Sequence, residues 1–180
     1  MQQFIFLLSL PVSLFSILNK IFLVKGKRSG WLWGAMVGLS STIYFFLIGL
    51  KILSIAEIGF LIIMIYGYIV HTKANKKLSL YASIILSLIS IILAILLFKN
   101  YLTNIETVSS LAFIWGGYYL ADKKVEIGWI LFIIAHLSTS FSSFNKGQLI
   151  FSLLQLVSAS ICIYGLIILR KNNNKNNLMI

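Results

Sequence analysis

The sequence contains few of the residues on which soluble domains depend. Only 11% of its 180 residues are charged, and only 4 are Asp or Glu, whereas about a quarter of a typical soluble domain is charged. With a single cysteine, Cys162, the chain cannot form an internal disulfide. Apolar residues make up 59%, more than a compact domain of this length can bury. The composition therefore excludes a soluble enzyme, a nucleic-acid-binding protein and a disordered chain, and it indicates an integral membrane protein.

Motifs that carry catalysis or nucleotide binding are also missing. The chain contains no HExxH, GxSxG or CxxC pattern and no glycine-rich phosphate loop. Its two histidines and four acidic residues are too few for a convincing metal site or acid–base pair. The sequence therefore predicts no enzymatic activity, no cofactor and no metal, and an intramembrane enzyme is the weakest alternative.

Charged and turn residues divide the chain into seven apolar runs that can cross a membrane as helices. The runs are Phe4–Val24, Trp31–Leu50, Ile52–Val70, Leu78–Phe98, Thr107–Ala121, Ile127–Phe144 and Leu149–Leu169. Only Lys51 separates the second run from the third, so a six-span chain is the alternative there. The first run lacks a basic segment before it and a small-x-small site after it, which predicts a retained helix. We expect an all-α membrane protein with seven transmembrane helices.

Basic residues mark one side of the membrane. When alternate loops are grouped, one side holds 12 Lys and Arg residues and the other holds 3. The twelve are Lys20, Lys25, Lys27, Arg28, Lys73, Lys76, Lys77, Lys123, Lys124, Arg170, Lys171 and Lys175; the three are Lys51, Lys99 and Lys146. Cytoplasmic loops carry such an excess, so the C-terminus is expected in the cytoplasm and the N-terminus outside. The net charge of +11 then reflects topology and the lipid bilayer, not a nucleic-acid partner.

An internal repeat relates the two halves of the chain. Shifting residues 30–73 by 98 positions onto residues 128–171 gives 14 identities in 44 positions without a gap. Gly30-Trp31 falls on Gly128-Trp129, and Tyr66-Gly67 falls on Tyr164-Gly165. Matched Trp, Gly and Tyr residues are harder to attribute to chance than matched aliphatic residues.

The repeat predicts two parallel three-helix bundles joined by an inversion helix. Three spans reverse the chain direction, so the uncharged fourth span restores it before the second bundle begins. The expected units are a first bundle (1–73), a linker helix (74–99), a second bundle (100–171) and a disordered cytoplasmic tail (172–180). Parallel repeats that hold a substrate at their interface are a transporter design.

Ionisable residues inside membrane spans are costly and usually line a cavity. Glu57 lies about one turn into the third span, and His136 lies in the middle of the sixth. The repeat places Gln155 on Glu57, so both halves put a hydrogen-bonding group at the same depth. The alternatives are a Glu57 side chain that reaches the outer surface or pairs with Lys51, and a His136 side chain bonded to a backbone carbonyl. Glu106 is expected at the outer interface.

Aromatic residues have two interpretations. Trp31, Trp33 and Trp129 lie at span ends, where an interfacial belt is expected. Trp115 lies in the middle of the fifth span and is followed by Tyr118, so these rings can enclose a flat ligand. Phe132 is assigned the same role, and His136, Glu57 and Gln155 are expected to hydrogen-bond the ligand's polar groups.

The order of these features resembles the PnuC-type vitamin transporters over nearly the whole chain. The segments that carry the resemblance are Gly30-Trp31-Leu32-Trp33-Gly34, Tyr44-Phe45-Phe46, Tyr66-Gly67, Leu120-Ala121-Asp122-Lys123-Lys124-Val125-Glu126 followed by Trp129, Tyr164-Gly165 and Arg170-Lys171. The resemblance implies a SWEET-like fold with a 3+1+3 arrangement in the bacterial inner membrane. It further implies facilitated diffusion of nicotinamide riboside, phosphorylation of the substrate by a cytoplasmic kinase, and a homotrimer.

The chain departs from the family pattern at three positions that the resemblance assigns to ligand contact. Phe132 and His136 stand where the family often has Trp and Asn, and Gly117 stands where a Gln is expected. The leading hypothesis is therefore a facilitator for a vitamin or nucleoside, most often nicotinamide riboside in this family. Thiamine or riboflavin transport is the first alternative, and a non-transporting membrane scaffold subunit is the second.

Overall fold

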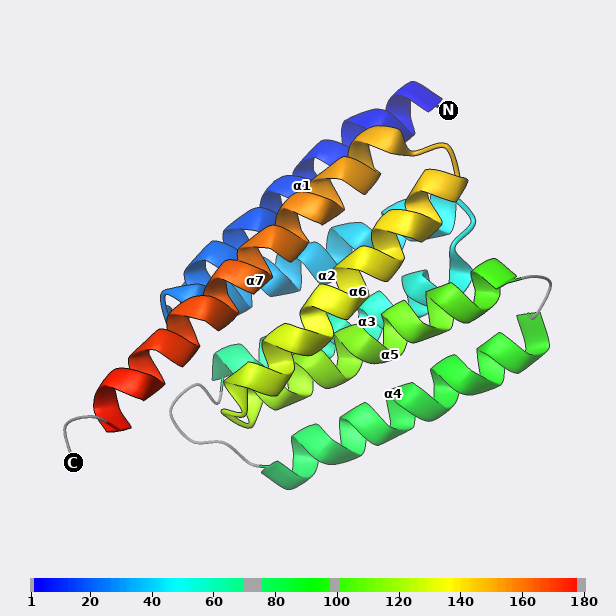
Figure 1. Ribbon diagram of the computed structural model, residues 1–180. Helices are drawn as coiled ribbons and strands as arrows, with labels where there is room; N and C mark the ends of the chain where they lie inside the picture. The colour runs from blue at the N-terminus through cyan, green and yellow to red at the C-terminus, as the bar shows by residue number, and fades with distance from the viewer. Residues whose placement is uncertain (1, 70–75, 98–100, 178–180) are drawn as a thin grey trace.

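A computed structural model describes residues 2–69, 76–97 and 101–177, and these residues form helices and no strands (Figure 1). The helices are α1 (Gln2–Val24), α2 (Ser29–Leu47), α3 (Lys51–Ile69), α4 (Lys76–Leu97), α5 (Tyr101–Ala121), α6 (Val125–Asn145) and α7 (Leu149–Asn177). Consecutive helices run in alternating directions, so the loops gather at two ends of the bundle. We call the end with loops 25–28 and 122–124 and the C-terminus of α7 the basic end.

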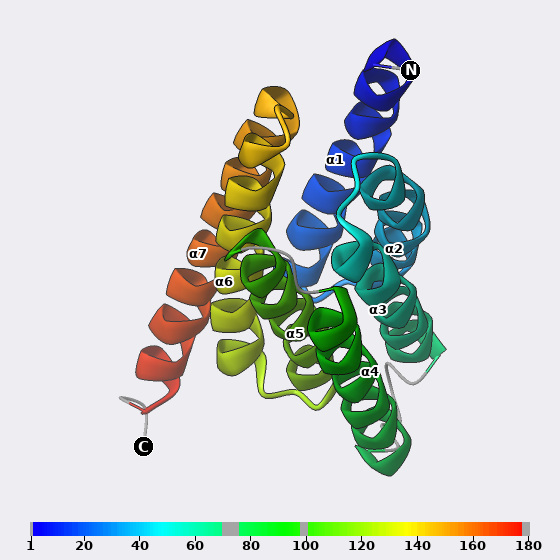
Figure 2. The same ribbon diagram turned by 90° about the vertical axis from the view of Figure 1, so that its right-hand side faces the viewer.

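Six of the helices form a closed ring, and α4 lies outside it. Helix α1 packs on α2, α2 on α3, α3 on α5, α5 on α6, α6 on α7, and α7 on α1. Within the described residues α4 packs only on α3 and α5, and Figure 2 shows it on the outer side of the bundle. The two halves, α1–α3 and α5–α7, meet along two helix contacts, which we call the α3–α5 seam and the α7–α1 seam. If the two halves are exchanged, each seam takes the place of the other. The predicted architecture of two parallel three-helix bundles and a linker helix is confirmed.

Most of the helices meet the requirements of a membrane span. Helices α1, α2, α3, α6 and α7 are long and apolar enough to cross a bilayer, and α4 contains a shorter apolar stretch, Ser83–Leu96. Helix α5 is more polar than these helices. Its polar residues Thr103, Glu106, Ser109 and Ser110 are all buried in protein. Polar side chains are tolerated at membrane depth where they face other helices instead of lipid.

The second and third apolar runs, which only Lys51 separates in the sequence, form two separate helices, α2 and α3. Gly49 has a φ of 78°, a left-handed conformation that glycine adopts without steric cost. The N–H of Gly49 donates to the carbonyl of Phe46, and the N–H of Leu50 donates to that of Phe45. These bonds end α2 in a Schellman-type cap, so the chain turns before Lys51 and the six-span alternative is wrong.

The same cap occurs between α6 and α7. Gly147 has a φ of 74°, its N–H donates to Phe144, and the N–H of Gln148 donates to Ser143. Every one of these positions is 98 residues beyond its counterpart at Gly49. The backbone therefore reproduces the repeat found in the sequence.

The two loops at the basic end, 25–28 and 122–124, are also equivalent, but their positions differ by 97 residues instead of 98. Gly26 and Lys123 have φ values of 64° and 63°. The N–H groups of Gly26 and Lys123 donate to Leu23 and Leu120, respectively. Helix α1 thus aligns with α5 at an offset of 97 residues, and the position equivalent to Gly117 in the first half is occupied by Lys20.

Two boundaries differ from the sequence prediction by more than three residues. Helix α5 begins at Tyr101 instead of Thr107, so Glu106 lies within the helix, in its second turn. Glu106 is buried, and its Oε2 accepts the N–H of Ile52 at 3.3 Å, at the start of α3. Helix α7 continues to Asn177, into the segment expected to be a disordered tail, because extending an existing helix needs no new nucleation.

Each half contains a tryptophan packed on a glycine. Trp31 lies against Gly67 of α3, and Trp129 lies against Gly165 of α7. Both tryptophans are buried, so the interfacial belt expected for these two residues is wrong: glycine on the neighbouring helix leaves room for the indole inside the bundle. Trp33 is only half-buried and stacks on Phe15, with 5.7 Å between ring centroids.

We expect Gly67→Ala to destabilise the protein by about 1–3 kcal/mol, because overpacking a close helix contact has that cost. A Cβ atom at position 67 would overlap the six-membered ring of Trp31. Thermal unfolding in detergent measures the loss. The substitution should cost much less in a Trp31→Ala background; an equal cost in both backgrounds would show that the indole is not the cause.

Candidate functional site

A small cavity lies on the axis of the six-helix ring. All six ring helices contribute to its lining, and α4 does not. Its lining residues are Val12, Ser16, Lys20, Val37, Ser41, Phe45, Glu57, Phe60, Phe113, His136 and Gln155. The free space is about 10 Å³, roughly enough for one water molecule. The structure is therefore closed around its centre and leaves no room there for a molecule of vitamin size.

The polar groups predicted from the sequence meet in this cavity. Glu57, His136 and Gln155 are 3%, 2% and 4% exposed, and all three line it. The Nδ1 of His136 lies 2.7 Å from Oε1 of Gln155. With a carbonyl oxygen as its partner, Nδ1 carries the proton and donates, which leaves Nε2 as an acceptor. Glu57 and His136 therefore share one cavity, to which each half contributes.

Two of these polar atoms have no protein partner among the described residues. They are Oε2 of Glu57 and Nε2 of His136. A buried polar atom without a hydrogen bond costs about 1–3 kcal/mol, so each of these two atoms is available to a water molecule or a ligand. Neither side chain follows the alternative proposed for it, because Glu57 does not reach the surface and His136 bonds a side chain instead of a carbonyl. Both atoms are suited to hydrogen-bond a ligand.

Lys20 is a member of the site that the sequence analysis missed. It is 1% exposed, and its Nζ donates to Oδ1 of Asn19 at 2.6 Å. Lys20 and Glu57 line the same cavity, although no direct ion pair joins them in the described structure. A count of basic residues by loop includes Lys20 because it lies near residues 25–28. Its place inside an apolar run was the signal that could have identified it.

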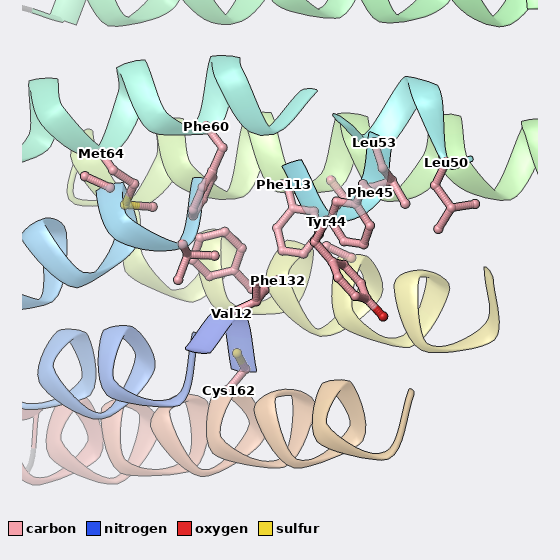
Figure 3. Packing of buried hydrophobic residues seen from close by; sticks show 14 of the residues in the cluster. Val12, Tyr44, Phe45, Leu50, Leu53, Phe60, Met64, Phe113, Phe132 and Cys162 are labelled. Atoms are coloured by element: carbon pink, nitrogen blue, oxygen red, sulfur yellow. The ribbon is translucent and has the colours of Figure 1, made fainter. Parts of the chain in front are cut away.

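Aromatic rings surround the polar groups. The ring of Phe132 lies 6.0 Å from that of Phe60 and 6.2 Å from that of Phe113, measured between centroids. Figure 3 shows these three rings close together, with Phe45 and Tyr44 beside them. The Phe113 ring also meets the His136 imidazole edge-on, at 5.1 Å. Faces of this kind can bind a flat or cationic ring.

The other predicted aromatic residues lie elsewhere. Trp115 is half-buried, and its ring contacts Tyr118 at 5.5 Å and Tyr119 at 6.0 Å. Neither Trp115 nor Tyr118 is among the residues that line the cavity. Of the six site residues predicted from the sequence, the structure thus brings Glu57, His136 and Gln155 into the lining and Phe132 against it, and it sets Trp115 and Tyr118 apart.

The departures from the family pattern converge on this same place. Phe132 and His136 pack together, with 6.4 Å between ring centroids. A Cβ atom at Gly117 would lie 3.7 Å from the ring of Phe60. Lys20 Nζ lies 4.6 Å from the centroid of Phe132. The residues that distinguish this chain from the pattern therefore surround one central region.

A second and larger hollow opens at the basic end, between the two halves. Its volume is about 180 Å³, and Leu23, Lys27, Trp31, Leu120 and Lys123 contribute to its lining. Loop residues of both halves form it, so it lies where the basic ends of the two bundles meet. It contains none of the predicted site residues.

The groups that line the site are suited to binding a small molecule. Among the residues that the structure describes, no group of three or more His, Cys, Asp or Glu side chains could hold a metal ion. The cavity combines an ammonium, a carboxylate, an imidazole and an amide with aromatic faces. Such a set recognises a small molecule with a ring and several hydrogen-bonding groups.

Comparison with known proteins gives one family. The model of a family described as Nicotinamide mononucleotide transporter matches residues 7–171, nearly the whole chain. The match spans both halves and the linker helix. No curated protein and no solved structure matches the chain significantly.

Proposed function

The chain belongs to the nicotinamide mononucleotide transporter family, and from that premise we propose that it carries nicotinamide riboside across a bacterial inner membrane by facilitated diffusion. The observation that carries this proposal is the central cavity, in which Glu57 and His136 keep unpartnered polar atoms between two halves that repeat each other. A multi-pass membrane protein of a transporter family with such a centre is organised to hold a small molecule between its bundles.

The chemistry of nicotinamide riboside matches the groups in the cavity. Its pyridinium ring is a flat cation, which favours the faces of Phe60 and Phe132 and the carboxylate of Glu57. Its carboxamide and ribose hydroxyls can bond His136 Nε2 and Gln155. Among the described residues, the lining holds one basic side chain, Lys20, and one acidic side chain, Glu57, so the cavity offers a phosphate group no excess of positive charge, which favours the nucleoside over a nucleotide.

The transport step follows from the closed ring. Because the free space is about 10 Å³, substrate binding requires the first half (1–73) to rock against the second (100–171), with the linker (74–99) outside the moving interface. We assign the basic end to the cytoplasm, with the C-terminus inside and the N-terminus outside. Trp115 and Tyr118, which lie toward the basic end of α5, are proposed to contact the ligand on its way out.

Accumulation then depends on a partner enzyme. A facilitator only equalises concentrations, so a cytoplasmic kinase that phosphorylates the nucleoside would make uptake one-way. A homotrimer would place three such pathways side by side. Thiamine or riboflavin remains the alternative substrate, because Phe132, His136 and Gly117 differ from the family pattern at the ligand-contact positions.

Uptake into proteoliposomes tests the proposal. We expect saturable entry of labelled nicotinamide riboside that stops at equal concentrations, is insensitive to ionophores and accumulates only with an entrapped kinase and ATP. Saturable uptake of thiamine or riboflavin alone would assign the alternative substrate. Absence of saturable uptake of all three would contradict transport and favour the scaffold hypothesis.

A further inference from the structure

The ammonium of Lys20 occupies the kind of environment that binds an organic cation. Its Nζ lies 4.6 Å from the ring centroid of Phe132 and 5.9 Å from that of Phe60. Glu57 lines the same cavity as Lys20. Aromatic faces and an opposing carboxylate are the groups that recognise pyridinium and quaternary ammonium ions. The proposed substrate and Lys20 therefore require the same two elements of the site.

Lys20 is anchored only lightly in this position. Its one hydrogen bond within the described structure goes to Oδ1 of the adjacent Asn19, and Asn19 in turn donates to the carbonyl of Gly30 at 2.8 Å. Helix α1 ends at Val24, one turn beyond Lys20. A lysine side chain so close to a helix end can extend its ammonium toward the water at that end.

The second half lacks a matching charge. The position equivalent to Lys20 is Gly117, where an added Cβ atom would meet only the side chains of Ile63, Phe60 and Met64 at its nearest contacts. The repeat therefore provides one cation and one carboxylate in the cavity, not two of each. Either charge becomes uncompensated when the other is removed.

We propose that Lys20 is a specificity-determining residue, a resident cation that competes with a positively charged substrate ring for Phe60, Phe132 and Glu57. This inference rests on the proposed function and deepens it. A cationic ring must displace the ammonium toward the basic end, whereas a neutral ring of the same shape meets no such repulsion. The competition lowers the affinity for the cation, which favours release once the site opens.

The nicotinamide riboside cation and its reduced dihydropyridine form make a matched pair of probes, because they share a shape and differ in ring charge. Lys20→Met preserves the length of the side chain and removes the charge. We expect the variant to bind the cation about tenfold more tightly than the wild type, while the affinity for the reduced form changes less than twofold. Calorimetry on purified protein in detergent measures both dissociation constants.

Two further variants keep the test decisive. Lys20→Arg retains the positive charge and should keep the wild-type ratio of the two affinities. Lys20→Gln should shift that ratio as Lys20→Met does, which covers poor folding of the methionine variant. A wild-type ratio in both neutral variants, with clear binding of both probes, would overturn the inference and leave the proposed function intact. Binding of neither probe by the wild-type protein would instead contradict the proposed function.

Discussion

Replacing Glu57 by glutamine is expected to reduce the efficiency of nicotinamide riboside uptake at least about thirtyfold. Removing one partner of a buried charge pair between a ligand and its site typically costs about 2–5 kcal/mol or more, and each 1.4 kcal/mol is a factor of ten. The substitution removes the negative charge that attracts the pyridinium ring and leaves Lys20 as an uncompensated cation beside it. The repeat indicates that the fold tolerates the change, because Gln155 already occupies the equivalent position in the second half.

The same substitution at the surface provides the control. Glu126 is half-exposed and pairs with Arg170 at 2.6 Å, and exposed pairs contribute little. We expect Glu126→Gln to change uptake less than twofold. Initial rates in proteoliposomes, normalised to reconstituted protein, give both values. Equal uptake by Glu57→Gln and the wild type would mean that the carboxylate is not part of the pathway.

A disulfide across the α1–α7 seam is expected to abolish transport reversibly. The hydroxyl oxygens of Ser16 and Ser158 lie 3.2 Å apart in the two halves, and Ser16 lines the cavity. Cysteines in their place are close enough for a disulfide without a large backbone shift. If the halves must separate for the ligand to enter, oxidation of Ser16→Cys/Ser158→Cys should reduce uptake more than about tenfold, and a reductant should restore it.

A second cysteine pair distinguishes movement between the halves from other effects of oxidation. The hydroxyl oxygens of Ser140 and Ser152 lie 2.9 Å apart on α6 and α7, within one half. A disulfide there should leave uptake near its reduced level. Both pairs are made with Cys162→Ala, because Cys162 lies one turn from Ser158. Full activity of the oxidised Ser16→Cys/Ser158→Cys protein would contradict opening at this seam.

The architecture was largely predictable because charge and hydropathy fix it directly. Each loop between spans contains charged or turn residues, so six of the seven predicted helices begin within two residues of the observed ones. The exception, α5, begins six residues earlier, since its polar first turns face other helices and look like a loop in the sequence. The repeat was also visible, because Gly49 and Gly147 are required by the same backbone turn in each half.

The site was predictable in part. Glu57, His136 and Gln155 were identifiable because polar groups within apolar runs are rare and costly. Phe60 and Phe113 could not be distinguished from the many other phenylalanines, since a phenylalanine in the core and one that faces a ligand occur in the same sequence pattern. Trp115 lies in the middle of an apolar run, as expected of a ligand-binding residue. Only the packing of α5 shows that its ring turns toward Tyr118 and Tyr119.

Lys20 shows why sequence position alone is insufficient for a charged residue. It lies five positions from Lys25, so a count of loop charges includes it. In the folded ring, however, the Lys20 side chain reaches Phe132 of α6, and its ammonium lies 4.6 Å from the centroid of that ring inside the bundle. Lys20 is assigned to the site because of the helices that surround it, and only the three-dimensional structure shows which helices these are.

A structure of the protein with nicotinamide riboside bound tests the central claim most directly. We predict ligand density on the axis of the six-helix ring, with the pyridinium ring against Phe60 and Phe132 and its polar groups within hydrogen-bonding distance of His136 and Gln155. The α1–α7 and α3–α5 seams should be wider than in the closed structure. Ligand density confined to the hollow at the basic end, with the central cavity unchanged, would contradict the account.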